Sequence, residues 1–103
     1  MRREGAVRAY IHHDNRLIAY AMVTCETDFV ARNEQFLEFV DGVAMSIAAV
    51  VNQEGLWGEG FGRPVHFAPW ASDDSLTVQD KLDEVRELFK EKIEIMGWDR
   101  REL

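Results

Sequence analysis

The alternation of hydrophobic and polar residues near the start of the chain predicts a β-hairpin. Residues 5–13 and 17–25 are apolar runs rich in β-branched and aromatic side chains, and they are separated by Asp14, Asn15 and Arg16. Short polar residues of this kind favour a tight turn between antiparallel strands. We therefore expect the domain to begin with two paired strands.

The second of these strands is apolar on both faces. Its odd-numbered positions from 17 to 23 are Leu, Ala, Ala and Val, and the alternate positions are Ile18, Tyr20 and Met22. A strand buried on one face only would alternate apolar and polar residues. The pattern predicts that other elements cover this strand on both sides.

Two amphipathic helices and a last strand follow. The first helix is expected to begin after Asn33, a suitable N-cap, and to run for about 17 residues with apolar side chains at three- and four-residue spacing. The second has Thr77 and Asp80 in the spacing of a capping box at its start, and we expect it to end near residue 90. The final residues alternate Ile93 and Ile95 with polar neighbours, which predicts a third strand.

The order of elements is therefore β-β-α-loop-α-β, an α+β fold of one domain over residues 1–103 with an irregular connection at 52–76. Two helices can cover one face of a three-stranded antiparallel sheet, but the sequence offers no further strands to cover the other face. We expect a homodimer that buries this face, with Ile18, Tyr20 and Met22 as candidate contact residues.

Composition and charge limit the classes of partner. Twelve Lys and Arg against nineteen Asp and Glu give a net charge of −7, so the average field repels phosphate backbones and anionic lipids. We expect neither a nucleic acid nor a membrane as partner. The single cysteine, Cys25, cannot form an internal disulfide, and the sequence shows no secretory leader or membrane-length apolar run, so we expect a cytoplasmic protein.

The sequence offers little for catalysis or metal binding. His12, His13 and Asp14 are neighbours at a strand end, but adjacent strand residues point to opposite faces. His66 has no second ligand at a suitable spacing, and Cys25 follows an apolar strand, where a cysteine is usually a small buried hydrophobe. We expect no metal site, no cofactor and no catalytic residue.

One short segment stands out at the junction between the second strand and the first helix. Thr27, Asp28, Phe29 and Val30 place a bulky aromatic side chain beside an acid in a short connection. An aromatic ring there has a hydration cost unless something covers it. Two interpretations are open: either Asp28 caps a helical turn while Phe29 folds under the helix as core, or Phe29 faces another molecule.

These residues carry a resemblance to a known family. The stretch CETDFVARNEQF closely resembles the Thr-Asp-Phe-Val signature of the core domain of elongation factor Ts, the guanine nucleotide exchange factor for elongation factor Tu. EGAVRAYIHHDNR resembles that family's first hairpin, FLEFVDGVAMSIAA its first core helix, and APWASDDSLTVQDKL its loop into the closing helix. The resemblance covers residues 4–50 and 64–103 and implies the dimerisation-domain fold of that family, in a shortened form with a single core subdomain.

The resemblance also implies a role for the segment. In that family the aromatic residue inserts beside the magnesium and phosphate site of the GTPase, and the acid helps to hold the displaced elements. Phe29 and Asp28 match these two positions, and Thr27 and Val30 would shape the turn. The implied function is a translation elongation factor that binds elongation factor Tu and promotes GDP exchange, which couples two binding equilibria and makes or breaks no bond.

Departures from the family pattern leave a second function open. Nothing before Glu4 resembles the N-terminal helical domain that docks on elongation factor Tu, and the second core subdomain has no counterpart, so we expect exchange to be slow. Lys90 stands where the family usually has Gly. The alternative is a non-exchanging binding or assembly module that binds or sequesters elongation factor Tu. Some family members have one core subdomain per chain and dimerise through their sheets, in agreement with the dimer expected from the second strand.

Overall fold

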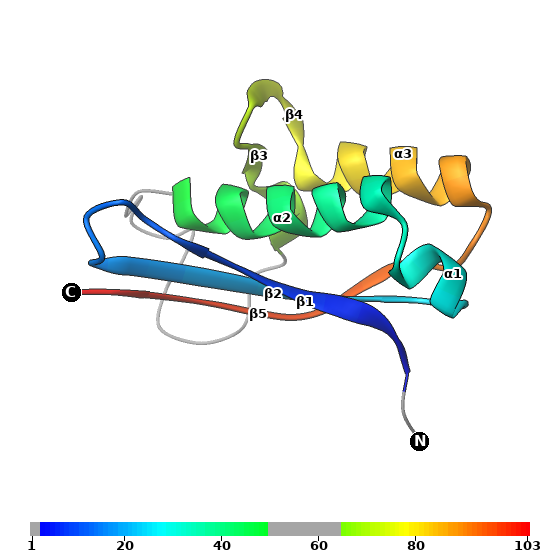
Figure 1. Ribbon diagram of the computed structural model, residues 1–103. Coiled ribbons are helices and arrows are strands. Elements are labelled where there is room, and N and C mark those ends of the chain that lie inside the picture. The colour runs from blue at the N-terminus through cyan, green and yellow to red at the C-terminus, as the bar shows by residue number, and fades with distance from the viewer. Residues whose placement is uncertain (1–2, 50–64) are drawn as a thin grey trace.

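A three-stranded antiparallel sheet forms one layer of the protein (Figure 1). The structure is a computed structural model that describes residues 3–49 and 65–103. β1 (Glu4–Ile11) pairs with β2 (Leu17–Cys25), and β2 pairs with β5 (Glu94–Glu102), so the last strand of the chain lies beside the second. The three predicted strands and their antiparallel arrangement are confirmed.

The turn between β1 and β2 forms as the sequence predicts. Asn15 has a φ of 60°, in the left-handed region that asparagine tolerates better than most residues. Its amide donates to the carbonyl of His12 at 2.9 Å, and the Asp14 carboxylate accepts a hydrogen bond from the amide of Arg16 at 3.0 Å. Short polar residues therefore close this hairpin, because local acceptors bind the backbone amides of the turn.

Helix α2 (Glu34–Ala49) packs on the sheet and supplies the largest share of the core among the described residues. Its start matches the predicted cap, because the side chain of Asn33 accepts a hydrogen bond from the amide of Gln35 at 2.8 Å. It lies against β2, where Ala19 and Ala21 are fully buried and small enough to let a helix approach closely. The buried apolar residues of α2 are Phe36, Phe39, Val40, Val43, Ala44, Ile47 and Ala48. The end of the predicted helix of about 17 residues, from residue 50 on, lies outside the described residues.

Helix α3 (Val78–Phe89) lies beside α2 on the same face of the sheet (Figure 1). It starts with the predicted capping box, in which the Thr77 hydroxyl accepts from the amide of Asp80 at 3.2 Å and the Asp80 carboxylate accepts from the amide of Thr77 at 2.8 Å. It ends at Lys90, whose φ of 56° and ψ of 35° form a left-handed cap, a position that glycine fills most easily. The predicted α+β fold with two helices on one face of the sheet is confirmed.

Residues 65–77 form a short 3-10 helix and a two-stranded sheet. The 3-10 helix η1 (Val65–Phe67) leads into β3 (Pro69–Trp70), which pairs with β4 (Asp73–Thr77). The sequence pattern does not predict these two strands, and they do not cover the other face of the three-stranded sheet. This part of the expected irregular connection is mostly regular, whereas residues 52–64 lie outside the described residues. The hairpin lies on the helical side of the sheet, against α2 and α3 (Figure 1).

Tertiary contacts of Trp70 explain why this hairpin forms. Its ring stacks on Phe39 with centroids 5.9 Å apart, and Gly42 leaves the space that the indole fills, since a Cβ there would lie 2.2 Å from ring atoms. The buried hydroxyl of Ser46 accepts a hydrogen bond from the amide of Ala71 at 3.0 Å. These contacts come from α2, so the β3–β4 hairpin cannot be predicted from its local sequence alone.

The face of the sheet opposite the helices is open within the described part of the chain. Its apolar residues with exposures of 40–61% are Val7, Ile11, Ile18, Met22 and Met96. The described elements of the single chain therefore cover β2 on one side only, through the helices. The same part of the chain contains no helix that is both long enough and apolar enough to cross a membrane.

Candidate functional site at the strand-to-helix turn

The Thr-Asp-Phe-Val segment forms a single helical turn between β2 and α2. Helix α1 (Asp28–Ala31) is capped by Thr27, whose hydroxyl accepts a hydrogen bond from the amide of Val30 at 3.3 Å. The interpretation in which Asp28 is the cap is therefore wrong. The turn ends where the amide of Asn33 donates to the carbonyl of Val30 at 2.9 Å, directly before α2 begins.

Phe29 and Val30 lie in opposite environments. Val30 is 4% exposed and belongs to the core, whereas Phe29 is 78% exposed. Successive residues of a helix are about 100° apart around its axis, so anchoring Val30 turns Phe29 away from the core. The interpretation of Phe29 as a core residue is wrong, and its ring is open to another molecule.

Asp28 lies beside Phe29 and is accessible as well. Its carboxylate pairs with the guanidinium of Arg32 at 3.0 Å, one turn further along, and the two side chains are 64% and 80% exposed. Exposed pairs at this spacing contribute about 0.3–0.5 kcal/mol. A partner can therefore replace this ion pair with its own contacts at a small cost in free energy.

Glu91, from the connection between α3 and β5, holds the start of this turn. Its Oε1 accepts hydrogen bonds from the amides of Glu26 at 2.9 Å and Thr27 at 3.2 Å, and its Oε2 accepts one from the Thr27 hydroxyl at 2.6 Å. The hydrogen bond from the Thr27 hydroxyl is the main cause of a lowered Glu91 pKa, and the two amides act in the same direction. Sequence reasoning missed Glu91 because it lies 64 residues from Thr27 and no local pattern links the two.

Cys25, at the end of β2, is a structural residue. It is buried, and its Sγ donates to the carbonyl of Thr27 at 3.3 Å. Burial raises the pKa of the thiol, and the negative charge of Glu91 raises it further. A thiol that stays protonated is a poor nucleophile, in agreement with the interpretation of Cys25 as a small buried hydrophobe.

The histidines are held by ordinary contacts. His12 Nδ1 lies 2.9 Å from the hydroxyl of Tyr10, and its ring centroid lies 4.1 Å from that of His13. The expectation that His12 and His13 point to opposite faces is therefore wrong, because β1 ends before His12 and neither histidine belongs to the strand. Burial lowers the pKa of His66, and the positive charge of Arg86 acts in the same direction. In the part of the chain that the structure describes, no three His, Cys, Asp or Glu side chains come together as a metal site would require.

A surface groove lies between α2, α3 and the β3–β4 hairpin. It has a volume of about 410 Å³, and its lining includes the aromatic rings of Phe39 and Trp70 and the carboxylates of Glu38 and Glu84. None of residues 27–30 lines it. The turn therefore presents a protruding side chain, whereas the groove is a concave surface built from other elements.

The sheet-face candidates Ile18, Tyr20 and Met22 lie together on the open face of β2. They alternate with Ala19 and Ala21, which are fully buried under the helices. Ile18 and Met22 are 40% and 42% exposed, and Tyr20 is half-buried. The turn and the open sheet face are thus two different accessible surfaces of the described residues.

Several known proteins that resemble this chain are elongation factor Ts proteins. Elongation factor Ts of Synechococcus sp. (strain JA-2-3B'a(2-13)) is 55% identical over 51 residues, which are 50% of this chain and 20% of that protein. The elongation factor Ts proteins of Rippkaea orientalis and Synechocystis sp. are 53% identical over 55 residues and 51% identical over 51 residues, and these matches cover 22% and 23% of the two proteins. No protein-family profile matches the chain.

The matches cover only part of this chain and a small part of each relative. They cover 50–53% of this chain, so the identity is high over about half of its residues. The chain spans about a fifth of the length of the curated relatives that it matches. The resemblance of this chain to elongation factor Ts is thereby confirmed over about half of its length.

Proposed function

We propose that this protein is a translation elongation factor of the elongation factor Ts type, which binds elongation factor Tu in the cytoplasm and promotes release of its bound GDP. The observation that carries the proposal is the exposed ring of Phe29, which projects from a helical turn anchored in the core by Val30. In the complex, Phe29 inserts beside the magnesium and phosphate site of the GTPase, and Asp28 makes polar contacts next to it. The sequence similarity to elongation factor Ts over half of the chain supports this role.

Phe29 acts together with other contacts in this proposal. Weakening nucleotide binding a thousandfold needs about 4 kcal/mol of coupling between the two binding sites, and burying one Phe side chain contributes about 1.5–3 kcal/mol. Further contacts with the partner must therefore supply the rest. No covalent chemistry is required of this chain, because exchange changes only the relative affinities of nucleotide and factor.

The test is the release of a fluorescent GDP analogue from elongation factor Tu after the full chain is added. The wild-type protein should accelerate release, and Phe29→Ala should remove most of that acceleration. Phe67→Ala is the matched control, because Phe67 is 73% exposed on η1 and lies outside the turn. An unchanged release rate with the wild-type protein, or equal acceleration by wild type and Phe29→Ala, contradicts the proposal.

A second candidate function is binding of elongation factor Tu without exchange, as an assembly or sequestering module. The exposed ring of Phe29 and the similarity to elongation factor Ts support it as well, because both functions share the binding step. Capture of elongation factor Tu by the immobilised chain, together with no change in GDP release, would select this function. Loss of capture in Phe29→Ala would then place the turn in the interface.

We further propose that two copies of the chain pair through their open sheet faces. Ile18, Tyr20 and Met22 lie on β2, the middle strand of the sheet, and apolar side chains of β1 extend the surface. Pairing removes these side chains from water, which stabilises the dimer by about 25 cal/mol for each Å² of apolar area. Light scattering should show a dimer for the wild type and a monomer for Met22→Glu, with Leu88→Glu on the exposed surface of α3 as the control. A wild-type monomer at micromolar concentration contradicts the pairing.

A further inference from the structure

The turn that carries Phe29 is fixed by one side chain from a distant part of the sequence. Both carboxylate oxygens of Glu91 are used: Oε1 accepts from the amides of Glu26 and Thr27 at 2.9 and 3.2 Å, and Oε2 accepts from the Thr27 hydroxyl at 2.6 Å. Hydrogen bonds to an ionised carboxylate are roughly twice as strong as those between neutral groups. Three donors on two consecutive residues therefore converge on one negative charge.

The Thr27 hydroxyl connects this carboxylate to the turn itself. A hydroxyl has a single proton to donate, and here that proton goes to Glu91. The oxygen lone pairs are then directed toward the amide of Val30, which donates to them at 3.3 Å and so completes the cap of α1. Glu91 thereby orients the hydroxyl that caps α1, while the burial of Val30 determines which side of α1 faces the core.

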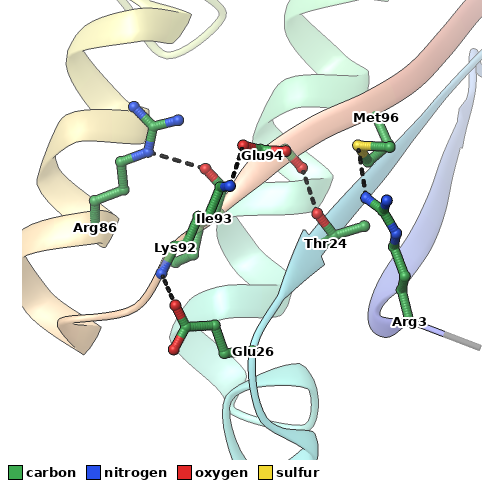
Figure 2. A network of polar contacts seen from close by, with 8 residues as sticks. All are labelled: Arg3, Thr24, Glu26, Arg86, Lys92, Ile93, Glu94 and Met96. Atoms are coloured by element: carbon green, nitrogen blue, oxygen red, sulfur yellow. Dashed lines mark hydrogen bonds and ion pairs between the residues drawn. The ribbon is translucent and has the colours of Figure 1, made fainter.

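The segment that carries Glu91 is itself held in place (Figure 2). The Nε of Arg86 on α3 donates to the carbonyl of Ile93 at 2.9 Å, and the Lys92 amide donates to the Glu26 carboxylate at 3.0 Å. Glu26 lies at the start of the turn and Glu91 in the connection between α3 and β5. Each of these carboxylates therefore accepts hydrogen bonding from the backbone of the segment that carries the other. The hydrogen bonds donated by Arg86 and Lys92 fix the connection that carries Glu91 against α3 on one side and against the start of the turn on the other.

We infer that Glu91 is a positioning residue, which holds residues 27–30 in the orientation that presents Phe29 to a partner. The identity of the partner rests on the proposed function, whereas the holding of the turn is a property of the free protein. Without Glu91, the buried Val30 still anchors α1 in the core. The amides of Glu26 and Thr27 lose their acceptor, however, and the start of the turn opens more often.

Amide hydrogen exchange of the full chain, measured by NMR, tests the holding of the turn directly. Glu91→Ala should speed exchange at the amides of Glu26 and Thr27 by about tenfold or more, since a hydrogen bond to a charged group changes an equilibrium constant by one to two decades. Glu91→Gln keeps one acceptor oxygen and should give a smaller increase. Glu87→Ala is the matched control, because Glu87 is exposed on α3 and pairs with Lys90. Unchanged protection in α2 shows that the variants stay folded.

The release of GDP from elongation factor Tu tests whether Glu91 affects the presentation of Phe29 to the partner. Glu91→Ala should slow the GDP release obtained at saturating protein, whereas combining it with Phe29→Ala should cause no further loss, because Glu91 acts through Phe29. A purely structural role predicts losses that add. Unchanged amide exchange at Glu26 and Thr27 in Glu91→Ala, or additive losses in the double variant, overturns the inference.

Failure of the inference and failure of the proposed function give different results. If the wild-type protein does not speed GDP release, the proposed function fails, and amide exchange alone decides whether Glu91 positions the turn. If the wild-type protein speeds release and Glu91→Ala equals it in both measurements, the inference fails and the proposed function stands.

Discussion

Replacing Phe29 with alanine should leave the stability of the free protein almost unchanged while it removes the effect on the partner. Phe29 is 78% exposed, so only about a fifth of its surface is kept from water by the rest of the chain. Its neighbour Val30 is 4% exposed and lies in the core. A comparison of Phe29→Ala with Val30→Ala therefore separates the presentation of the ring from the anchoring of the turn.

The magnitudes follow from the burial of each side chain. Burying a Phe side chain completely is worth about 1.5–3 kcal/mol, so a fifth of that burial is worth about 0.3–0.6 kcal/mol. Truncating a fully buried Phe costs about 3–5 kcal/mol, because a cavity is left behind in addition. Removing the two methyl groups of the buried Val30 should cost about 2 kcal/mol. Truncating Val30 should thus lower the free energy of unfolding at least three times as much as truncating Phe29.

Urea unfolding followed by far-ultraviolet circular dichroism measures both free energy differences. All variants are compared at one protein concentration, because the proposed pairing of two copies would make the midpoint depend on concentration. We expect Phe29→Ala to unfold close to the wild type and Val30→Ala to unfold at clearly lower urea. A loss above about 2 kcal/mol for Phe29→Ala in a monomeric sample would refute the reasoning, since it would approach the value of about 3–5 kcal/mol expected for a ring packed inside its own subunit.

Three further predictions concern the end of α3, the packing of Trp70 and the pKa of Glu91. Lys90→Gly should stabilise the protein by about 0.5–1 kcal/mol in urea unfolding, because the left-handed conformation at φ 56° is unfavourable for a residue with a Cβ; an unchanged or lower midpoint contradicts this. Gly42→Ala should destabilise it by about 1–3 kcal/mol, since the new Cβ would lie 2.2 Å from the ring of Trp70, and a neutral result would mean that the indole moves away freely. The pKa of Glu91 is lowered in the folded protein, chiefly by the hydroxyl of Thr27, so its contribution is complete above its ordinary value of 4.5 and is lost as the pH falls through the lowered one. The stability difference between the wild type and Glu91→Gln should therefore shrink in acid, and a difference that grows as the pH falls would contradict this sign.

Much of the fold could be predicted because its signals are local. The turn at Asn15 and the capping box of Thr77 and Asp80 are satisfied by residues within four positions of each other, so their sequence neighbourhood specifies them. The β3–β4 hairpin was missed because it depends on contacts with α2. Trp70 needs the ring of Phe39 beside it, and that contact is invisible in the spacing of residues 65–77.

At the candidate site, the sequence by itself determined that a Thr-Asp-Phe-Val segment joins a strand to a helix and that it resembles elongation factor Ts. Only the tertiary structure decided which side of the turn faces outward and what holds it there. The direction of Phe29 follows from the burial of Val30, which requires the assembled core. The support from Glu91 crosses 64 residues of sequence, and hydrogen bonds over such separations form only when the packing of helices and sheet brings the two connections together.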